Sequence, residues 1–531
     1  MAKDKVKQNA AENTPEGPGG GEPQRQAVIF LGAGACAMMV AEQPPAGPLR
    51  VLDVLSRPIE LAHDVFSTNK VSRETMDRCV QVMRGYKELL TEYGSGGDPV
   101  PVRLLATNVL TDVTNMDAFV NRLQTACGLH LEVMDDGEMT RLLYQNMQTM
   151  LQSHPELEKK RLAVLHVGPG NTRLLLFERG RLAYYASYRM GAHRTGEAII
   201  ASDAGGSDSE CSLIREHVRG VMEQLRHDAA DALADVPDAL VIFGPDFHCI
   251  SSPLIVGDTI TAEGLTRLVD EIADTPYNSR MERYEEDYVG VVALLPTAVI
   301  YQAVVSEFSP RSIFIAKEEY THEFLRSLLN NGNNDSALEE EMLHFSMLQA
   351  SRYKVDRAHS QQVRRLCTAL FDNLQDLHGL GHHDRLLLKV AAILHEVGTY
   401  ISPKKHHHHS QYIILNSEIF GLSRHDVEIV GLLARYHRHS TPSAQDRHYA
   451  ELDLQDRLRV QKLAALLRVA DALERAHAHR IANFTVRYKP RRLELLVPGV
   501  RDLTIENLAL RSKADLFTEI FGYDIQLLPA E

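Results

Sequence analysis

The segments AVIFLGAGACAMMV at residues 27–40 and LAVLHVGPGNTRLLLF at residues 162–177 decide the fold. Each segment has the pattern of a buried strand, a glycine turn and a returning strand, and alternating helix and strand patterns follow both. An opening that recurs within one chain indicates a duplicated module. We therefore expect an α/β architecture in the first 325 residues, built from two units that begin at these turns.

The pattern changes after residue 330. The stretch NNGNNDS at residues 330–336 is typical of a linker, and apolar residues then recur at helical spacing until about residue 480. From residue 483 the period becomes that of strands, with one more helix pattern at 514–521. The sequence thus predicts a disordered tail at 1–25, a first lobe at 26–150, a second lobe at 151–325, a helical domain at 337–480 and a small α+β segment at 481–531.

Composition narrows the possible partners and the compartment. A net charge of −14 repels nucleic acid and anionic membranes, so we expect to find neither as a partner. The first 26 residues are polar and lack a secretory signal, and the apolar run at 27–40 is shorter than the ~20 residues of a membrane-spanning helix. Six cysteines without a C-x-x-C pair fit a reducing compartment. A cytoplasmic protein is therefore expected.

Histidines and acidic residues gather at helix edges in the C-terminal third. They include His359, the pair His395 and Glu396, His437 and Asp471. Imidazole nitrogen with carboxylate oxygen suits a divalent transition metal that holds water or phosphate. The pattern therefore predicts a metal-dependent phosphohydrolase site. A single histidine at a helix end is more often a hydrogen-bonded residue, and the run 406–408 is interpreted as a solvated surface.

Short motifs along the chain support one family. They are found at residues 106–108, 112–115, 141–142, 168–172 and 189–191 in the first half, and at 394–398, 405–410, 434–438, 464–475 and 511–517 in the second. In this order they resemble the exopolyphosphatase and guanosine pentaphosphate phosphohydrolase (Ppx/GppA) family, in its long form with a C-terminal HD-type domain. The resemblance implies two actin-like (ribonuclease H-like) lobes, a cleft for a phosphate chain, a helical HD-type domain and a possible homodimer. It favours polyphosphate, a guanosine polyphosphate or another phosphorylated small molecule as the ligand.

The chain departs from that family where the cleft needs carboxylates. Phe30 stands for the aspartate of the first strand, and Met139 for the catalytic glutamate. His166 and Arg173 replace the acidic residues on either side of the second glycine turn, and the family's phosphate turn is Asp-Phe-His at 246–248. Little then remains to bind Mg²⁺ or activate water. We expect the cleft to be degenerate and without activity.

Resemblance to HD-type phosphohydrolases implies the roles of the C-terminal residues. His359, His395, Glu396 and Asp471 would be the core metal ligands, and His395 and Glu396 would serve catalysis. The extra histidines of two-metal sites would be His409 and His437, and the phosphate would meet Lys405, Arg435 and Arg438. The metal is left open among Mg, Mn, Fe and Zn. Glu396 stands where the family has aspartate, and its extra methylene moves the carboxylate away from tight two-metal geometry.

Two functions remain open at this point. The first is a phosphohydrolase that acts on phosphoanhydride or phosphoester bonds at the HD-type site. The second is a pseudoenzyme, a catalytically inactive sensor of a phosphate ligand or a scaffold. The retained histidines favour the enzyme, whereas Glu396 and the altered cleft favour the binding protein. Metal bound to the purified protein would separate the two.

Overall fold

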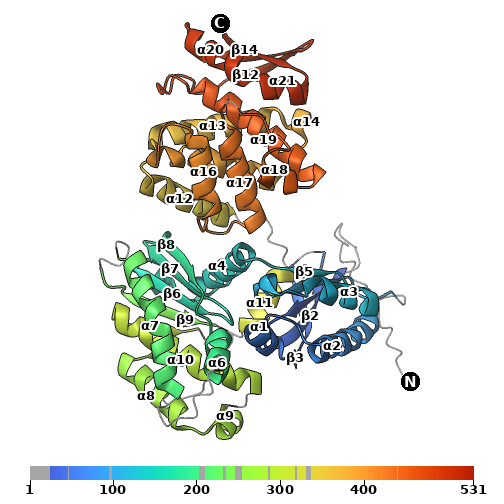
Figure 1. Cartoon of the computed structure of the whole chain (residues 1–531), viewed down its shortest axis with the longest axis vertical. Helices are drawn as coiled ribbons and strands as arrows, with labels where there is room; N and C mark the ends of the chain where they lie inside the picture. The colour runs from blue at the N-terminus through green and yellow to red at the C-terminus, as the bar shows by residue number, and fades with distance from the viewer. Residues whose placement is uncertain are drawn as a thin grey trace, which may run out of the picture.

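A computed structural model describes residues 24–530 except 46, 95–97, 202–209, 231–234, 245–253, 285–287, 317–319, 330–335 and 439. Most of the predicted tail and linker, and the Asp-Phe-His turn at 246–248, lie outside these residues. Two sheet-containing units form one end of the molecule. A helical part and a small third sheet form the other, and the C-terminus lies at the far end (Figure 1).

The first sheet has the strand order β3-β2-β1-β4-β5. Strands β1 (Gln24–Leu31), β2 (Ala35–Gln43) and β3 (Arg50–Pro58) form an antiparallel meander, and β4 (Val102–Ala106) and β5 (Leu131–Val133) join it in parallel. Helices α1 (Leu61–Thr68), α2 (Arg73–Glu92) and α3 (Met116–Cys127) contribute to the core of this unit. Strand β1 begins two residues inside the predicted tail.

The second sheet repeats this plan. Strands β6 (Leu162–Val167), β7 (Thr172–Glu178) and β8 (Arg181–Tyr188) form the meander, and β9 (Ala239–Phe243) and β11 (Ile313–Ile315) follow in parallel. Strand β10 (Thr259–Ile260) adds an antiparallel edge. The Gly32 N–H donates to Ala35 O at 2.8 Å and the Gly168 N–H to Asn171 O at 2.9 Å, so both openings close with equivalent hydrogen bonds. The predicted duplication is present, although the sequence did not indicate β3 or β8.

Helices cover the second sheet and link it to the first. They are α6 (Ala192–Ala201), α7 (Glu210–Asp228), α8 (Ala262–Asp274), α9 (Tyr277–Tyr284) and α10 (Tyr288–Phe308). Among the described helices, α10 alone has the length and apolar composition of a membrane span, but 78% of that stretch is buried, as in a core helix. Helix α11 (Tyr320–Leu329) then returns to the first sheet and packs on β1, β2 and α4 (Asp136–Ser153), next to the short α5 (Pro155–Glu158).

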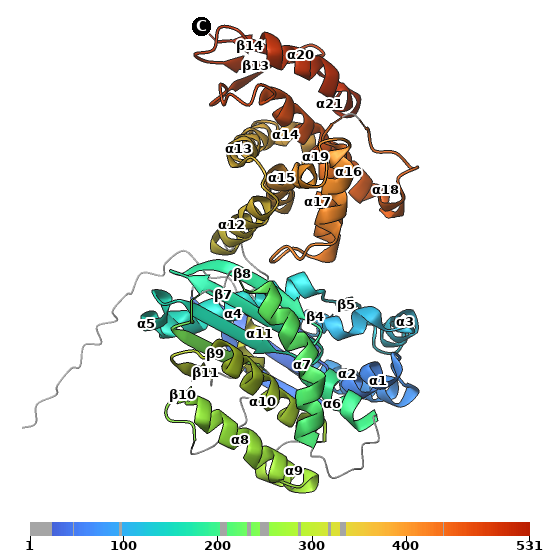
Figure 2. The same cartoon turned by 60° about the vertical axis from the view of Figure 1, so that its left-hand side comes forward.

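The helical part begins with α12 (Ser336–Arg352), which contacts β8 and α15 at the junction with the second sheet (Figure 2). It continues with α13 (Arg357–Asn373), α14 (Gln375–His378), α15 (His382–Leu394), the 3-10 helix η2 (Val397–Tyr400), α16 (His406–Leu415), α17 (Arg424–Tyr436), α18 (Arg447–Glu451) and α19 (Leu454–Leu473). Helices α13, α15 and α17 all pack against α19, whose residues 463–473 are buried without interruption. Apolar residues on every face of that segment explain why it lies at the centre.

The C-terminal segment forms a sheet of β12 (Thr485–Lys489), β13 (Arg492–Val497) and β14 (Asp524–Pro529). Its helices α20 (Thr504–Lys513) and α21 (Asp515–Phe521) pack against α19. The sequence predicted β12, β13 and α21, but neither α20 nor β14. Helix α20 matters for the site, because its last residue is buried beside α19.

Candidate metal centre

Three of the predicted ligands converge in the helical part. One ligand atom from each of His359 on α13, His395 at the end of α15 and Asp471 on α19 lies within 4.8 Å of the others, and all three residues are buried. His359 Nε2 is 3.8 Å from Asp471 Oδ1 and 3.9 Å from Glu396 Oε2. The centre is thus built from residues more than a hundred positions apart.

A tight turn lets the neighbours His395 and Glu396 both reach this centre. Helix α15 ends at His395, and the chain turns at once into η2. A Cβ at Gly398 would overlap the carbonyl oxygen of His406 and the amide of Ser410. Glycine is therefore required for the close approach of η2 and α16. The Ser410 hydroxyl fixes this turn, since it donates to His395 O and accepts from the Gly398 N–H.

The ring orientation of two histidines fits metal binding. His395 Nδ1 is 2.9 Å from Ala392 O, and His437 Nδ1 is 2.7 Å from Ala434 O. A carbonyl oxygen only accepts, so these Nδ1 atoms carry the hydrogen and Nε2 keeps its lone pair. Within the described structure, His395 Nε2 and both ring nitrogens of His359 are buried without a hydrogen-bond partner. A buried polar atom without a partner is costly, and a metal ligand needs such a free lone pair.

Burial favours the neutral forms of His359 and His437. It lowers the pKa of His359 to about 4, with a further contribution from His395, and lowers the pKa of His437 well below its ordinary value. Burial alone would raise the pKa of Asp471, but Lys513, His395 and His437 lower it overall. Neutral imidazoles beside an ionised carboxylate are the protonation states that a metal ion requires.

Lys513 is a member of the centre that sequence reasoning missed. This residue ends α20, and its Nζ atom forms a buried ion pair with Asp471 Oδ2. Arg468 holds the same segment, because it donates to Lys513 O at 2.8 Å and pairs with Asp515. The segment 511–517 was noted only as a family resemblance. Nothing in its local pattern shows which residue enters the centre.

The structure brings His406, rather than His409, beside His437. His406 Nε2 lies 3.2 Å from His437 Nε2, and His406 is buried, so the run 406–408 is not wholly a solvated surface as predicted. The reason is that α16 begins at His406 and its first turn packs on η2. The described contacts do not include one between His409 and the centre.

The three predicted phosphate-binding residues differ from one another in their exposure and in their charged neighbours. Lys405 is exposed, and Arg438 is half-buried and close enough to His406 to add to the effect of burial in lowering the pKa of that histidine. Arg435 forms an ion pair with Asp446, with 3.4 Å between Nε and Oδ2. Its charge is therefore partly neutralised. Lys405 and Arg438 are the better placed of the three for a phosphate.

The altered family positions take structural roles in the two sheets. The rings of Phe30 and Phe324 meet edge to face at 4.7 Å, and Met139 is buried in the core. His166 is buried, and burial together with Arg173 holds its pKa well below the ordinary value. Arg173 pairs with Asp136, whose carboxylate also accepts from Asn108 and Asn171 at 2.7 and 3.1 Å. The contacts of Asp136 with Arg173 and Asn171 join the two sheet units, whereas its bond with Asn108 lies within the first.

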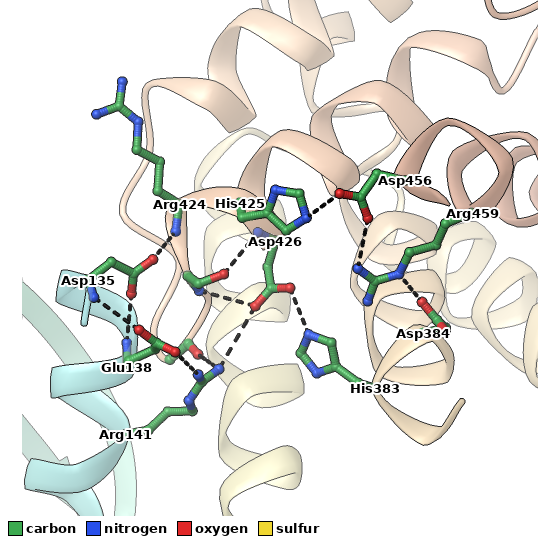
Figure 3. Close-up of polar contacts among 12 residues, drawn as sticks. Asp135, Glu138, Arg141, His383, Asp384, Arg424, His425, Asp426, Asp456 and Arg459 are labelled. Atoms are coloured by element: carbon green, nitrogen blue, oxygen red, sulfur yellow. Dashed lines mark hydrogen bonds and ion pairs between the residues drawn. The ribbon is translucent and has the colours of Figure 1, made fainter. Parts of the chain in front are cut away.

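The first turn of α4, which carries Met139, docks on the helical part (Figure 3). Asp135 caps α4 and also accepts from the Arg424 N–H at 2.6 Å. Arg141 donates to Gly421 O at 3.0 Å and lies 3.8 Å from Asp426, which in turn binds His383 at 2.6 Å. A cavity of about 480 Å³ lies next to this contact, lined by residues of both sheet units and of the helical part that include Asp136, Asn171, Arg189 and Arg424.

Two models of one protein family match this chain. The Ppx/GppA phosphatase family model matches residues 39–331, and the model of Ppx/GppA phosphatase domain III matches residues 346–515. The chain is similar to the solved Aquifex aeolicus family member, with 18% identity over 59% of this chain and 100% of that one and a TM-score of 0.44. It is also similar to an exopolyphosphatase from Cytophaga hutchinsonii, with 15% identity over 58% and 98% of the two chains and a TM-score of 0.47. Since the family model alone spans more than half of the sequence, this chain belongs to the Ppx/GppA phosphatase family.

Proposed function

We propose that the protein is a metal-dependent phosphohydrolase whose reaction takes place in the helical, HD-type part and not in the cleft between the sheet units. The convergence of His359, His395 and Asp471 carries this proposal. Histidine nitrogen and carboxylate oxygen are ligands that divalent transition metals accept, and the free Nε2 atoms of both histidines face a shared point. Membership of a phosphatase family supports hydrolysis of phosphate bonds.

The cleft offers little support for catalysis. Phe30 and Met139 have no acidic group, and Arg173 brings a positive charge to a place where the family resemblance implies a glutamate. That charge is paired with Asp136, so the carboxylate is already engaged by three donors. A thioether cannot accept a proton from water, and general-base catalysis is worth ~10² to 10⁴ in rate. We therefore place no hydrolysis in the cleft.

The side chains of the centre would have different roles in the reaction. His359, His395 and Asp471 would hold the ion, whose identity among Mg, Mn, Fe and Zn stays open. A bound divalent ion polarises the phosphoryl group and lowers the pKa of coordinated water. Glu396 is 22% exposed, against 8% for Asp471, so it is the carboxylate best placed to accept a proton from attacking water. Arg438 and Lys405 supply positive charge for the substrate.

The substrate class follows from the family and from the charge of the chain. Polyphosphate and guanosine polyphosphates carry phosphoanhydride bonds, and the family resemblance favours them. The chain has a net charge of −14, so a polyanion must be attracted by local cations such as Lys405 and Arg438. We propose a short phosphorylated molecule in preference to a long chain, because these cations are few.

The test is an activity assay on full-length variants. Hydrolysis of polyphosphate, guanosine tetraphosphate and cyclic nucleotides would be measured by chromatography of the products, with added Mn²⁺ or Zn²⁺. We expect activity in the wild type, loss of at least 10²-fold in His395→Ala, and no change in the matched control His408→Ala, whose side chain is exposed. The variant Asn171→Ala, at the glycine turn of the cleft, should also keep its activity. Unchanged hydrolysis in His395→Ala would place catalysis elsewhere.

A further inference from the structure

The two oxygens of Asp471 face different partners, the Lys513 ammonium and the imidazole of His359. Its Nζ atom is bonded to Asp471 Oδ2, while Asp471 Oδ1 faces His359 Nε2 at 3.8 Å. Oδ2 is therefore bonded to the Lys513 ammonium, whereas Oδ1 faces the converging ligand group. Ions in two-metal sites lie ~3.5 to 4 Å apart, so a second ion beside this centre would need ligands of its own close to Asp471.

The lysine is held in place by its neighbours in the chain. Arg468 is completely buried on α19, one turn before Asp471, and its Nε atom donates to Lys513 O at 2.8 Å. The same guanidinium pairs with Asp515. The chain at Lys513 and just after it is thus fixed to the helix that carries Asp471. Burying an ammonium costs several kcal/mol unless a counter-charge is present, so Lys513 can occupy this buried position only because Asp471 is its partner.

A second complete set of ligands is missing from the described residues. His406 and His437 bring their Nε2 atoms within 3.2 Å of each other, but the only group of three or more histidine, cysteine or acidic side chains that converges among those residues is His359, His395 and Asp471. These two histidines have no third ligand that converges with them among those residues, and we take Asp471 Oδ2 as the carboxylate oxygen that could move to supply one. Lys513 occupies that atom.

We propose that the centre binds one divalent ion, and that the Lys513 ammonium takes the place of a second cation on Asp471. This inference rests on the metal centre of the proposed function. The site would then hold the permanent single positive charge of an ammonium, where two-metal enzymes hold a second divalent ion that can exchange.

Metal counting on the full chain tests the inference. The apo-protein would be loaded with Mn²⁺ alone, desalted and analysed for manganese. We expect one Mn²⁺ per wild-type chain and two in Lys513→Met, where Asp471 Oδ2, His406 and His437 become free to act together. Lys513→Arg keeps the charge and should stay at one. The matched control Arg511→Met removes an exposed cation from the same helix and should also stay at one.

Electron paramagnetic resonance on the loaded wild type gives a readout that needs no variant. An isolated Mn²⁺ ion gives a six-line spectrum, whereas two ions a few ångströms apart give a broadened, exchange-coupled spectrum. Two ions in the wild type, or one ion in a folded Lys513→Met protein, would overturn the inference and leave the proposed function intact. If the wild type retains no metal, both this inference and the proposed function are wrong.

Discussion

Replacing Asp471 by asparagine leaves the Lys513 ammonium buried without its counter-charge. The side chain keeps its shape, and both Lys513 and Asp471 are less than one-tenth exposed, so solvent screens the pair only weakly. Breaking a buried pair by removing one partner costs about 3–5 kcal/mol. At about 1.4 kcal/mol for each factor of ten, the opening equilibrium around α19 should rise roughly 10²- to 4 × 10³-fold.

Hydrogen exchange measures this change where it occurs. The chain has several structural units and no tryptophan, so one global unfolding curve would average over them. Exchange of the amides of α19 (Leu454–Leu473), followed by mass spectrometry in EDTA, reports local opening directly. Asp471→Asn should accelerate exchange there by the factor given above, while amides of α2 (Arg73–Glu92) keep their rates.

A double substitution supplies the control. Asp471→Asn with Lys513→Met removes both charges, and replacing a buried ion pair by uncharged groups of similar size is often neutral. The double variant should therefore recover most of the lost protection. Acceleration below about threefold in Asp471→Asn, or no recovery in the double variant, would refute the view that Lys513 is buried as a paired cation.

Two further changes test the surroundings of the centre. Gly398→Ala places a methyl group against the carbonyl oxygen of His406, which should displace His395 and weaken Mn²⁺ binding at least tenfold by calorimetry, whereas Gly220→Ala, where the structure leaves open space, should bind as the wild type does. Asp426 is a docking residue. Burial, the largest single effect, would raise its pKa, but His383, Ser423 and Arg141 together outweigh burial and lower the pKa to about 2. A depressed carboxyl pKa contributes stability above its ordinary value of 3.8 that is lost as the pH falls towards about 2. Exchange of the first turn of α4 should accelerate across this window in the wild type, and Asp426→Asn should remove that pH dependence.

The parts of the fold that the sequence predicted are those with a strong local pattern. The two strand–glycine–strand openings were visible because β6 and β7 are almost wholly buried, as are the middle of β2 and most of the second half of β1, and these stretches are therefore apolar. Strand β3 was missed because its residues are half-buried or exposed. Strand β8 was missed because its buried positions recur at every third residue and do not alternate.

The candidate site shows the same difference between residues that have a recognisable sequence signal and residues that have none. His359, His395 and Asp471 were found because their spacing resembles a known domain, and the family resemblance carried that spacing. His406 was passed over in favour of His409, since a run of histidines has no apolar stripe to show where a helix begins. Lys513 could not be assigned, because its partner Asp471 lies 42 residues away and only the packing of α20 on α19 brings them together.

The return of α11 to the first sheet has a consequence for synthesis of the chain. Phe324 packs on Phe30, and Ser327 donates to Asn146 on α4 at 2.6 Å, so the first unit is completed by residues that leave the ribosome long after its strands. Until then, one face of β1 and β2 remains uncovered. Such late, non-local closure slows folding and prolongs the exposure of apolar surface. The nascent chain is therefore expected to depend on chaperones until residue 329 has emerged, and a truncation at residue 325 would cut through the first unit.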